Sequence, residues 1–160
     1  QSAALFDSMT VLDNVMFPLN MFSNDTLRDR TRRAMFCLER VNLIEAKDKF
    51  PGEISGGMQK RVAIARALAT DPEIIYFDEP TSALDPELTG EVLSVMRQLA
   101  EEGMTMLVVT HEMGFARNVS SKTVFMENGV VVEQAPSRQF FADPKEERTR
   151  EFLRKIAHTE

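Results

Sequence analysis

The sequence predicts an α/β protein with a mostly helical first half and a parallel sheet in its second half. Two observations support this: apolar residues recur at helical spacing up to about residue 70, and two later apolar runs each end at polar residues. The runs, residues 74–77 and 104–110, flank a helical segment. Because a strand, helix, strand sequence normally connects by a right-handed crossover, we expect the two strands to be parallel.

The first half is expected to contain three helices. The first begins near Thr10 and ends at a polar break at residues 23–25. The second has one apolar and one charged face and ends before about Leu43. The third follows residues 55–57 and ends before Pro72.

The second half begins with residues 74–77, an uninterrupted apolar run that predicts a strand buried on both faces. Asp85 is a suitable N-cap and Pro86 a suitable first residue for the next helix, which Gly103 ends. The second apolar run, residues 104–110, then forms the neighbouring strand.

The last 40 or so residues are expected to form a hairpin and two short helices. Asn128 and Gly129 favour the positive backbone angles of a tight hairpin turn between two apolar strands. Ser137 introduces one terminal helix, and Asp143 with Pro144 introduces the other.

Composition limits the possible functions. The 160 residues, 43% hydrophobic and 28% charged, suit one globular domain. The net charge of -6 argues against a protein that coats nucleic acid, so we expect no nucleic-acid partner. No apolar run approaches the roughly 20 residues of a membrane-spanning helix, and no secretory leader is recognisable, so a cytoplasmic location is expected. The single cysteine, Cys37, is expected to be a small core residue.

Titratable side chains follow both predicted strands of the sheet. Asp78 and Glu79 come after the first strand, and His111 follows the second. Ligands bind at the carboxyl ends of parallel strands, so we expect these three side chains to share one edge. Paired carboxylates there are typical of a metal–nucleotide site, in which one holds Mg²⁺ and its neighbour activates the attacking water. The alternative is a strand end with solvent-exposed acids.

A glycine pair precedes the third predicted helix. Gly56 and Gly57 allow a backbone to approach an anion closely, and the helix start supplies unpaired amides and a positive dipole end. Phosphate is the natural ligand of such a site. For Ser-Gly-Gly alone, a flexible linker before a helix is the more frequent explanation.

Taken together, these segments resemble the ATP-binding subunits of ABC transporters over nearly the whole chain. The resemblance implies a partial P-loop NTPase fold with an incomplete parallel sheet. Residues 1–70 would form the Q-loop and helical signature subdomain, and residues 71–160 the carboxyl-terminal part of the RecA-like core with terminal helices. Five motifs occur in the family's order: Gln1 as the Q-loop glutamine, residues 54–58 as the signature, 74–79 as Walker B, 82–85 as the D-loop and His111 as the switch histidine.

The resemblance implies ATP and Mg²⁺ as cofactors. Asp78 would hold Mg²⁺ through water, and Glu79 would act as general base. His111 would bridge Glu79 and the γ-phosphate, and Gln1 would sense the metal and the attacking water. The other implied nucleotide contacts are Ser55, Gly56, Gly57, Met58, Gln59 and Asp85.

The resemblance also implies protein partners. In the family two subunits sandwich two ATP molecules, so a homodimer or a paired ABC ATPase subunit is expected. Ser55 and Gly57 would hold the γ-phosphate of the partner's ATP, and Asp85 would cross the interface. Residues from Met9 to about Leu43 would dock on transmembrane permease subunits, which places the protein peripherally on the inner face of the cell membrane.

Two features depart from the family pattern. Met58 occupies a position where glutamine is most frequent, although Gln59 follows it, and we expect this change to be tolerated. A phosphate loop requires Gly-Lys followed by Ser or Thr, and none of the seven glycines precedes a lysine. The strand, loop and helix that grip the nucleotide are therefore expected to be absent. We expect this polypeptide alone neither to bind ATP tightly nor to hydrolyse it, and its uncovered apolar sheet edges to favour association.

The sequence gives two indications of the transported solute. Residues 1–69 resemble Mla-like phospholipid-trafficking ATPases, whereas residues from 71 onward, including 111–116 and 148–153, resemble polar amino-acid importers. The second resemblance covers the longer stretch, so amino-acid import is expected. A mosaic gene joined near residues 68–71 would explain both.

Two alternatives come from other classes. A DNA-repair or translation ATPase is disfavoured, because such relatives carry long coiled coils or a second cassette. The other alternative is a non-catalytic partner that contributes only its signature motif to an intact subunit.

Overall fold

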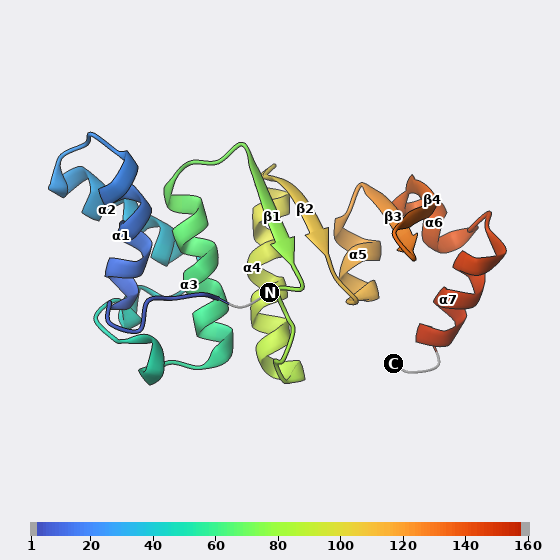
Figure 1. Ribbon diagram of the computed structural model, residues 1–160, viewed down its shortest axis with the longest axis horizontal. Helices are drawn as coiled ribbons and strands as arrows, with labels where there is room; N and C mark the ends of the chain where they lie inside the picture. Colours follow the sequence, from blue (N-terminus) through green and yellow to red (C-terminus); the bar gives the residue numbers. More distant parts are fainter. Residues whose placement is uncertain (1–2, 158–160) are drawn as a thin grey trace. The chain divides into compact units, whose positions relative to one another are not determined.

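The computed structural model describes residues 3–157, which form two compact units with the boundary between residues 110 and 111 (Figure 1). No helix of the described residues combines the length and the apolar character needed to cross a membrane. The elements of the first unit are α1 (Val11–Phe22), α2 (Leu27–Arg40), the 3-10 turns η1 (Ile44–Ala46) and η2 (Pro51–Glu53), α3 (Gly56–Ala69), β1 (Ile74–Asp78), α4 (Pro86–Glu101) and β2 (Thr105–Val109). Those of the second are α5 (Met113–Val119), β3 (Lys122–Glu127), β4 (Val130–Pro136), α6 (Ser137–Ala142) and α7 (Glu147–Ala157).

Side-chain caps start the four long helices of the first unit. Thr10, Thr26, Ser55 and Asp85 each have extended backbone angles and accept a hydrogen bond from the amide three residues later. At Thr10 the bond is reciprocal, because the Asp13 carboxylate accepts from the threonine amide in return. These caps satisfy amides that have no partner within the helix, so the sequence fixes the helix starts locally.

α1, α2 and α3 pack against one another and bury an apolar core between them. Cys37 of α2 is fully buried in this core, which confirms its prediction as a small core residue, and burial raises the pKa of its thiol. The core side chains include Val11, Val15, Leu19, Ala34, Leu38, Val62, Ala65 and Leu68.

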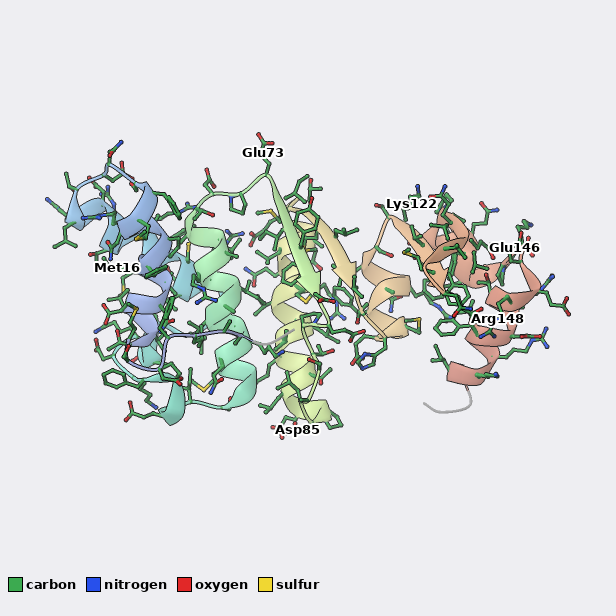
Figure 2. All side chains as sticks on the ribbon, in the orientation of Figure 1. Met16, Glu73, Asp85, Lys122, Glu146 and Arg148 are labelled. Atoms are coloured by element: carbon green, nitrogen blue, oxygen red, sulfur yellow. The ribbon has the colours of Figure 1, made fainter. Side chains whose placement is uncertain are left out.

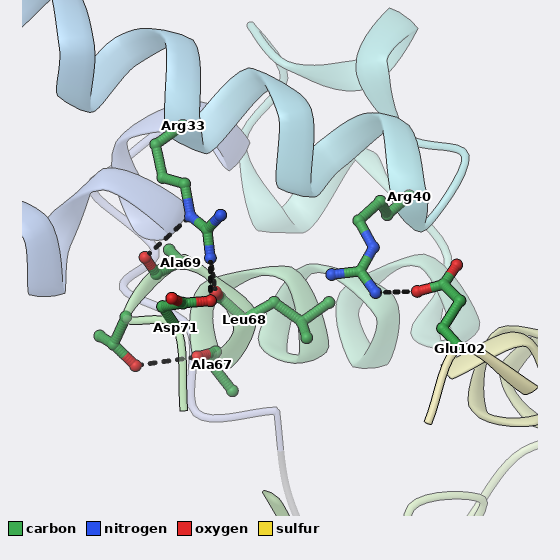
Figure 3. A network of polar contacts seen from close by, with 8 residues as sticks. Arg33, Arg40, Ala67, Leu68, Ala69, Asp71 and Glu102 are labelled. Carbon is green, nitrogen blue, oxygen red and sulfur yellow. Dashed lines mark hydrogen bonds and ion pairs between the residues drawn. The ribbon is translucent and has the colours of Figure 1, made fainter. Parts of the chain in front are cut away.

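Two arginines of α2 tie it to the ends of neighbouring helices (Figure 3). Arg33 donates to the carbonyl oxygens of Leu68, at 2.9 Å, and Ala69, at 3.3 Å, and pairs with the Asp71 carboxylate at 3.1 Å. These bonds add side-chain donors to carbonyls in the last turn of α3, where the regular helical hydrogen bonds end. Arg40 forms an ion pair with Glu102 at the end of α4.

β1 and β2 pair in parallel from Ile74 opposite Thr105 to Asp78 opposite Val109, which confirms the predicted parallel arrangement. The prediction that β1 is buried on both faces is wrong. Ile75 and Phe77 are buried, whereas one side chain in between, Tyr76, is 72% exposed. An apolar run allows a strand to be buried on both faces, but which faces are buried depends on the elements that pack against the sheet. The open sheet face consists of Ile74, Tyr76, Leu107 and Val109.

The second unit is built on the antiparallel hairpin β3–β4, whose turn contains Asn128 and Gly129 with φ of 51° and 78°. This confirms the predicted turn. Phe125 of β3 stacks on Phe152 of α7, with ring centroids 4.5 Å apart. The terminal helices α6 and α7 were also predicted, whereas the short α5, seven residues long, was missed.

Two acidic residues of the hairpin hold the start of α7. Glu133 is buried and accepts hydrogen bonds from the amides of Lys145, at 2.8 Å, and Glu146, at 3.1 Å. Glu127 binds the Arg148 guanidinium through Nε, at 2.9 and 3.0 Å, and through Nη2. The hairpin thereby supplies the negative charge that the amino terminus of α7 favours.

Candidate functional site

The glycine pair lies at the start of α3, where the structure confirms a helix amino terminus. The Ser55 Oγ accepts a hydrogen bond from the Met58 amide at 3.2 Å, so its hydroxyl caps the helix. Gly56 is exposed, Gly57 is buried and Ser55 is half-buried. The helix start is therefore open on one side, which leaves room for an anion at the amides of the first turn.

Gln59 lies one turn into α3 and has a partner of its own. Its Nε2 donates to the Pro51 carbonyl at 2.9 Å and so holds the η2 turn against the helix. Met58 is half-buried beside it. Nucleotide contacts by Met58 and Gln59 stay predictions.

The two carboxylates lie at the carboxyl end of β1. Asp78 is the last residue of the strand and is exposed, and Glu79 is half-buried. The Glu79 amide donates to the Val109 carbonyl of β2 at 2.9 Å, so the strand pair fixes the backbone that carries this side chain. Glu79 has φ of 47°, a left-handed conformation that costs a non-glycine residue about 1–2 kcal/mol.

Asp85 begins α4, and its Oδ1 accepts the Leu88 amide at 3.0 Å (Figure 2). Its side chain is exposed. The role of this residue as a helix cap is confirmed, whereas a contact across a dimer interface stays a prediction.

Lys60 of α3 connects the glycine-bearing helix to the loop after β1. Its Nζ lies 3.5 Å from the Ser82 Oγ, and burial lowers the pKa of its ammonium group. Lys60 also lines a small cavity of about 140 Å³ together with Asp78 and Phe77. A positive charge is thus placed near the predicted metal-binding carboxylate.

His111 is the first residue of the second unit. Its Nε2 lies 3.6 Å from the Glu112 carboxylate, and its side chain is exposed. Because Asp78 and Glu79 belong to the first unit, their meeting with His111 stays a prediction. Gln1 lies outside the described residues.

The predicted Mg²⁺ site depends on which side chains lie close enough together to act as ligands. Among residues 3–157 no group of three or more His, Cys, Asp or Glu side chains is arranged to hold a metal ion. Mg²⁺ at nucleotide sites needs only one or two carboxylates, because phosphate oxygens and water complete its coordination. The single exposed Asp78 fits that role.

The segment that leads from Gln1 to α1 is anchored by residues that sequence reasoning missed. Asn14 is fully buried in α1; its Oδ1 accepts the Phe6 amide at 2.9 Å, and its Nδ2 donates to the carbonyls of Phe6, Met9 and Thr10 at 3.0–3.2 Å. Arg66 donates to two further carbonyls of this segment at 2.9 and 3.0 Å. The signal in the sequence was an asparagine between apolar residues of a predicted helix, at a position that would face the core.

A second hollow, of about 490 Å³, lies between this segment, α1 and α3. Phe6, Phe17 and Pro18 give it apolar walls, and Arg66 contributes a charged one. Phe6 and Phe17 contact each other with ring centroids 4.6 Å apart. Of the residues named here, Phe17 and Pro18 belong to the segment from Met9 to about Leu43 that is expected to meet permease subunits.

Comparison with known proteins identifies the relatives of this arrangement. The chain is 53% identical over 152 residues to the glutamine transport ATP-binding protein GlnQ of Geobacillus stearothermophilus, which covers 95% of this chain and 63% of that protein. It is 50% identical over 159 residues to the glutamate/aspartate import ATP-binding protein GltL of Escherichia coli strain K12, with 99% and 66% coverage. The chain thus spans about two thirds or less of these relatives' length.

Solved structures agree with these relatives. The ATP-binding cassette MJ0796, in a dimeric post-hydrolysis state bound to ADP and Pi, superposes with a TM-score of 0.74 at 35% identity, over 86% of this chain and 61% of that one. This confirms the predicted partial ABC ATPase fold. The resemblance of residues 1–69 to phospholipid-trafficking ATPases finds no support, since the amino-acid transport relatives match through both halves of the chain. A family model described as ABC transporter matches residues 1–82, and the chain therefore belongs to the ABC transporter family.

Proposed function

We propose that this chain forms the signature, Walker B and D-loop part of the ATP-binding subunit of a polar amino-acid importer. The observation that carries the proposal is the match of 50–53% identity over 95–99% of the chain to proteins named for glutamine transport and glutamate/aspartate import. The geometry agrees with it, because Asp78 and Glu79 end a strand of a parallel pair and Ser55 starts a helix that is open to an anion.

ATP with Mg²⁺, when bound, supplies the phosphoanhydride whose hydrolysis drives transport. Asp78 would hold the metal, and Glu79 would accept a proton from the attacking water. The backbone hydrogen bond from Glu79 to Val109 keeps that carboxylate at the sheet edge. By the same resemblance His111 would contact the γ-phosphate, and Gln1 would report the state of the metal site.

The other half of the site serves a partner subunit. Ser55 and the glycines at the start of α3 bind the γ-phosphate of ATP held by the partner, since helix-start amides favour anions. Asp85 reaches across the interface from the start of α4. The helical part from Met9 to Leu43 docks on transmembrane permease subunits, so the subunit is peripheral to the inner face of the membrane.

Pairing that depends on nucleotide tests the proposal. The 160-residue chain is mixed with full-length GlnQ of Geobacillus stearothermophilus, and association is measured by analytical ultracentrifugation with Mg²⁺ and a non-hydrolysable ATP analogue, with Mg²⁺ and ADP, or with neither. We expect association only with the ATP analogue. Gly90→Ala is the control variant and should associate like the natural chain. Gly90 is exposed on α4, and a side chain there would contact nothing within 4 Å.

The pairing experiment has two contrary outcomes. Absence of association, or equal association without nucleotide, would contradict the proposal. The non-catalytic alternative is tested separately in a complete ATP-binding subunit that contains this chain, where Glu79→Gln should lower the ATPase rate if Glu79 is the base and leave it unchanged if the chain serves only as a partner.

A further inference from the structure

Gly57 is packed against α4 in a way that the binding of phosphate does not require. A Cβ atom at Gly57 would lie 3.1 Å from the Leu88 Cβ and 3.3 Å from its Cδ2. A Cβ is fixed by the backbone, so no change of rotamer moves the nearest of these atoms away. A side chain at Gly57 would fit only if the backbone around Leu88 gave way by a few tenths of an ångström.

Gly56 is under a different constraint, although it is the neighbouring glycine. It is exposed, and a Cβ there would meet only the Leu84 Cδ2, at 3.2 Å. That methyl group is the far end of a rotatable side chain and can turn away at small cost. Gly57 is thus the glycine of the pair that the rest of the fold requires.

Two further contacts join the same face of α3 to the segment after β1. The Lys60 Nζ lies 3.5 Å from the Ser82 Oγ, and the Arg61 Nη2 binds the Glu91 Oε2 at 2.8 Å. Residues three and four positions apart share one face of a helix, so Gly57, Lys60 and Arg61 present a single face to residues 82–91.

We infer that Leu88 is a positioning residue for the signature motif, and that Gly57 is glycine because Leu88 fills the space in front of it. The contact fixes the spacing between the starts of α3 and α4. Ser55 and Asp85 are the caps of these two helices, so they reach a partner subunit as one rigid pair. The consequence for the partner rests on the function proposed above, whereas the contact itself does not.

A set of unfolding measurements tests the contact. Urea unfolding is followed by far-UV circular dichroism, since the chain has no tryptophan. Gly57→Ala is made in the natural chain, in Leu88→Ala and in Leu88→Gly. We expect it to lower the urea midpoint in the first two, because both keep the Leu88 Cβ. In Leu88→Gly we expect it to raise the midpoint, because alanine is the better helix former once the obstruction is gone.

Gly56→Ala is the matched control for these measurements. Its effect on the midpoint is expected to keep one sign in all three backgrounds. If Gly57→Ala also shifted the midpoint by the same amount in all three, the Leu88 contact would not constrain this glycine and the inference would be overturned.

Pairing with GlnQ and the ATP analogue then tests the positioning role. Gly57→Ala is expected to weaken association about tenfold, the change that about 1.4 kcal/mol produces. The double variant Gly57→Ala/Leu88→Gly restores one methyl-sized group between the helices, so it is expected to bind more tightly than either single variant.

The remaining outcomes of the pairing experiment separate the two ideas. A double variant that binds no better than Gly57→Ala would mean that phosphate alone demands the glycine, which overturns the positioning role. If the natural chain did not pair at all, the proposed function and the positioning role would both fail, while a sign reversal in the unfolding series would still establish the contact.

Discussion

Replacing Asn14 with alanine is expected to destabilise the first unit by about 2 kcal/mol, although the residue lies outside every motif. The side chain is fully buried and forms one accepted and several donated hydrogen bonds to residues 6–10. Its Nδ2 carries two hydrogens, so at most three bonds form at one time. At about 1 kcal/mol net each, their loss costs about 3 kcal/mol.

Alanine recovers part of that loss. It is the better helix former by about 0.7 kcal/mol or less, which leaves a net cost of about 2 kcal/mol. With a urea dependence of about 2 kcal/mol per M, the midpoint of unfolding falls by about 1 M. The assay is far-UV circular dichroism in urea, combined with hydrogen exchange of the Phe6 amide, which donates to the Asn14 side chain at 2.9 Å.

Asn24→Ala is the control for this prediction, because Asn24 is exposed in the turn between α1 and α2. It is expected to change the free energy of unfolding by about 0.5 kcal/mol or less. If Asn14→Ala and Asn24→Ala unfolded at the same urea concentration, or if the Phe6 amide stayed protected in Asn14→Ala, the anchoring of this segment by Asn14 would be refuted.

Three further predictions concern other parts of the chain. Burial acts to raise the pKa of Glu133, but the amides of Lys145 and Glu146, together with the neighbouring Thr149 and Arg150, hold that pKa below its ordinary value. The ionised Glu133 therefore stabilises the fold above the ordinary carboxyl pKa, and this stabilisation is lost as the pH falls through the lowered pKa of Glu133. Glu133→Gln should make the melting temperature fall less steeply with decreasing pH, and an unchanged pH dependence would contradict this. Gly129→Ala places a side chain at φ of 78° and should destabilise the second unit by about 1–2 kcal/mol in thermal unfolding, whereas equal melting of both forms would disprove the strain. In a complete ATP-binding subunit that contains this chain, Glu79→Gln should lower the ATPase rate by about 10² to 10⁴-fold and keep nucleotide-dependent pairing, and a rate near that of the natural protein would exclude Glu79 as the base.

The features that were predictable from the sequence are those determined by neighbouring residues. Asp85 and Pro86 specify the start of α4, and Gly103 ends it with φ of 87°. Asn128 and Gly129 specify the hairpin turn in the same way. Each signal acts within a few residues, so no knowledge of packing was needed.

The features that were missed depend on distant parts of the chain. One-sided burial of β1 reflects which elements cover the sheet, and the buried Asn14 depends on a loop that folds back on α1. The carboxylates of the candidate site could be named from the sequence, but the left-handed backbone of Glu79 could not. The closeness of Gly57 to Leu88 joins residues 31 positions apart and is visible only in the fold.

The backbone of Glu79 has a consequence for how this chain evolves. At φ of 47° a glycine or an asparagine would have less backbone strain than glutamate. Stability alone would therefore favour a substitution of Glu79 by one of these residues. A lineage that ceased to need the carboxylate would gain stability from the first such substitution. At position 79 the proposed chemistry and the backbone conformation therefore favour different residues.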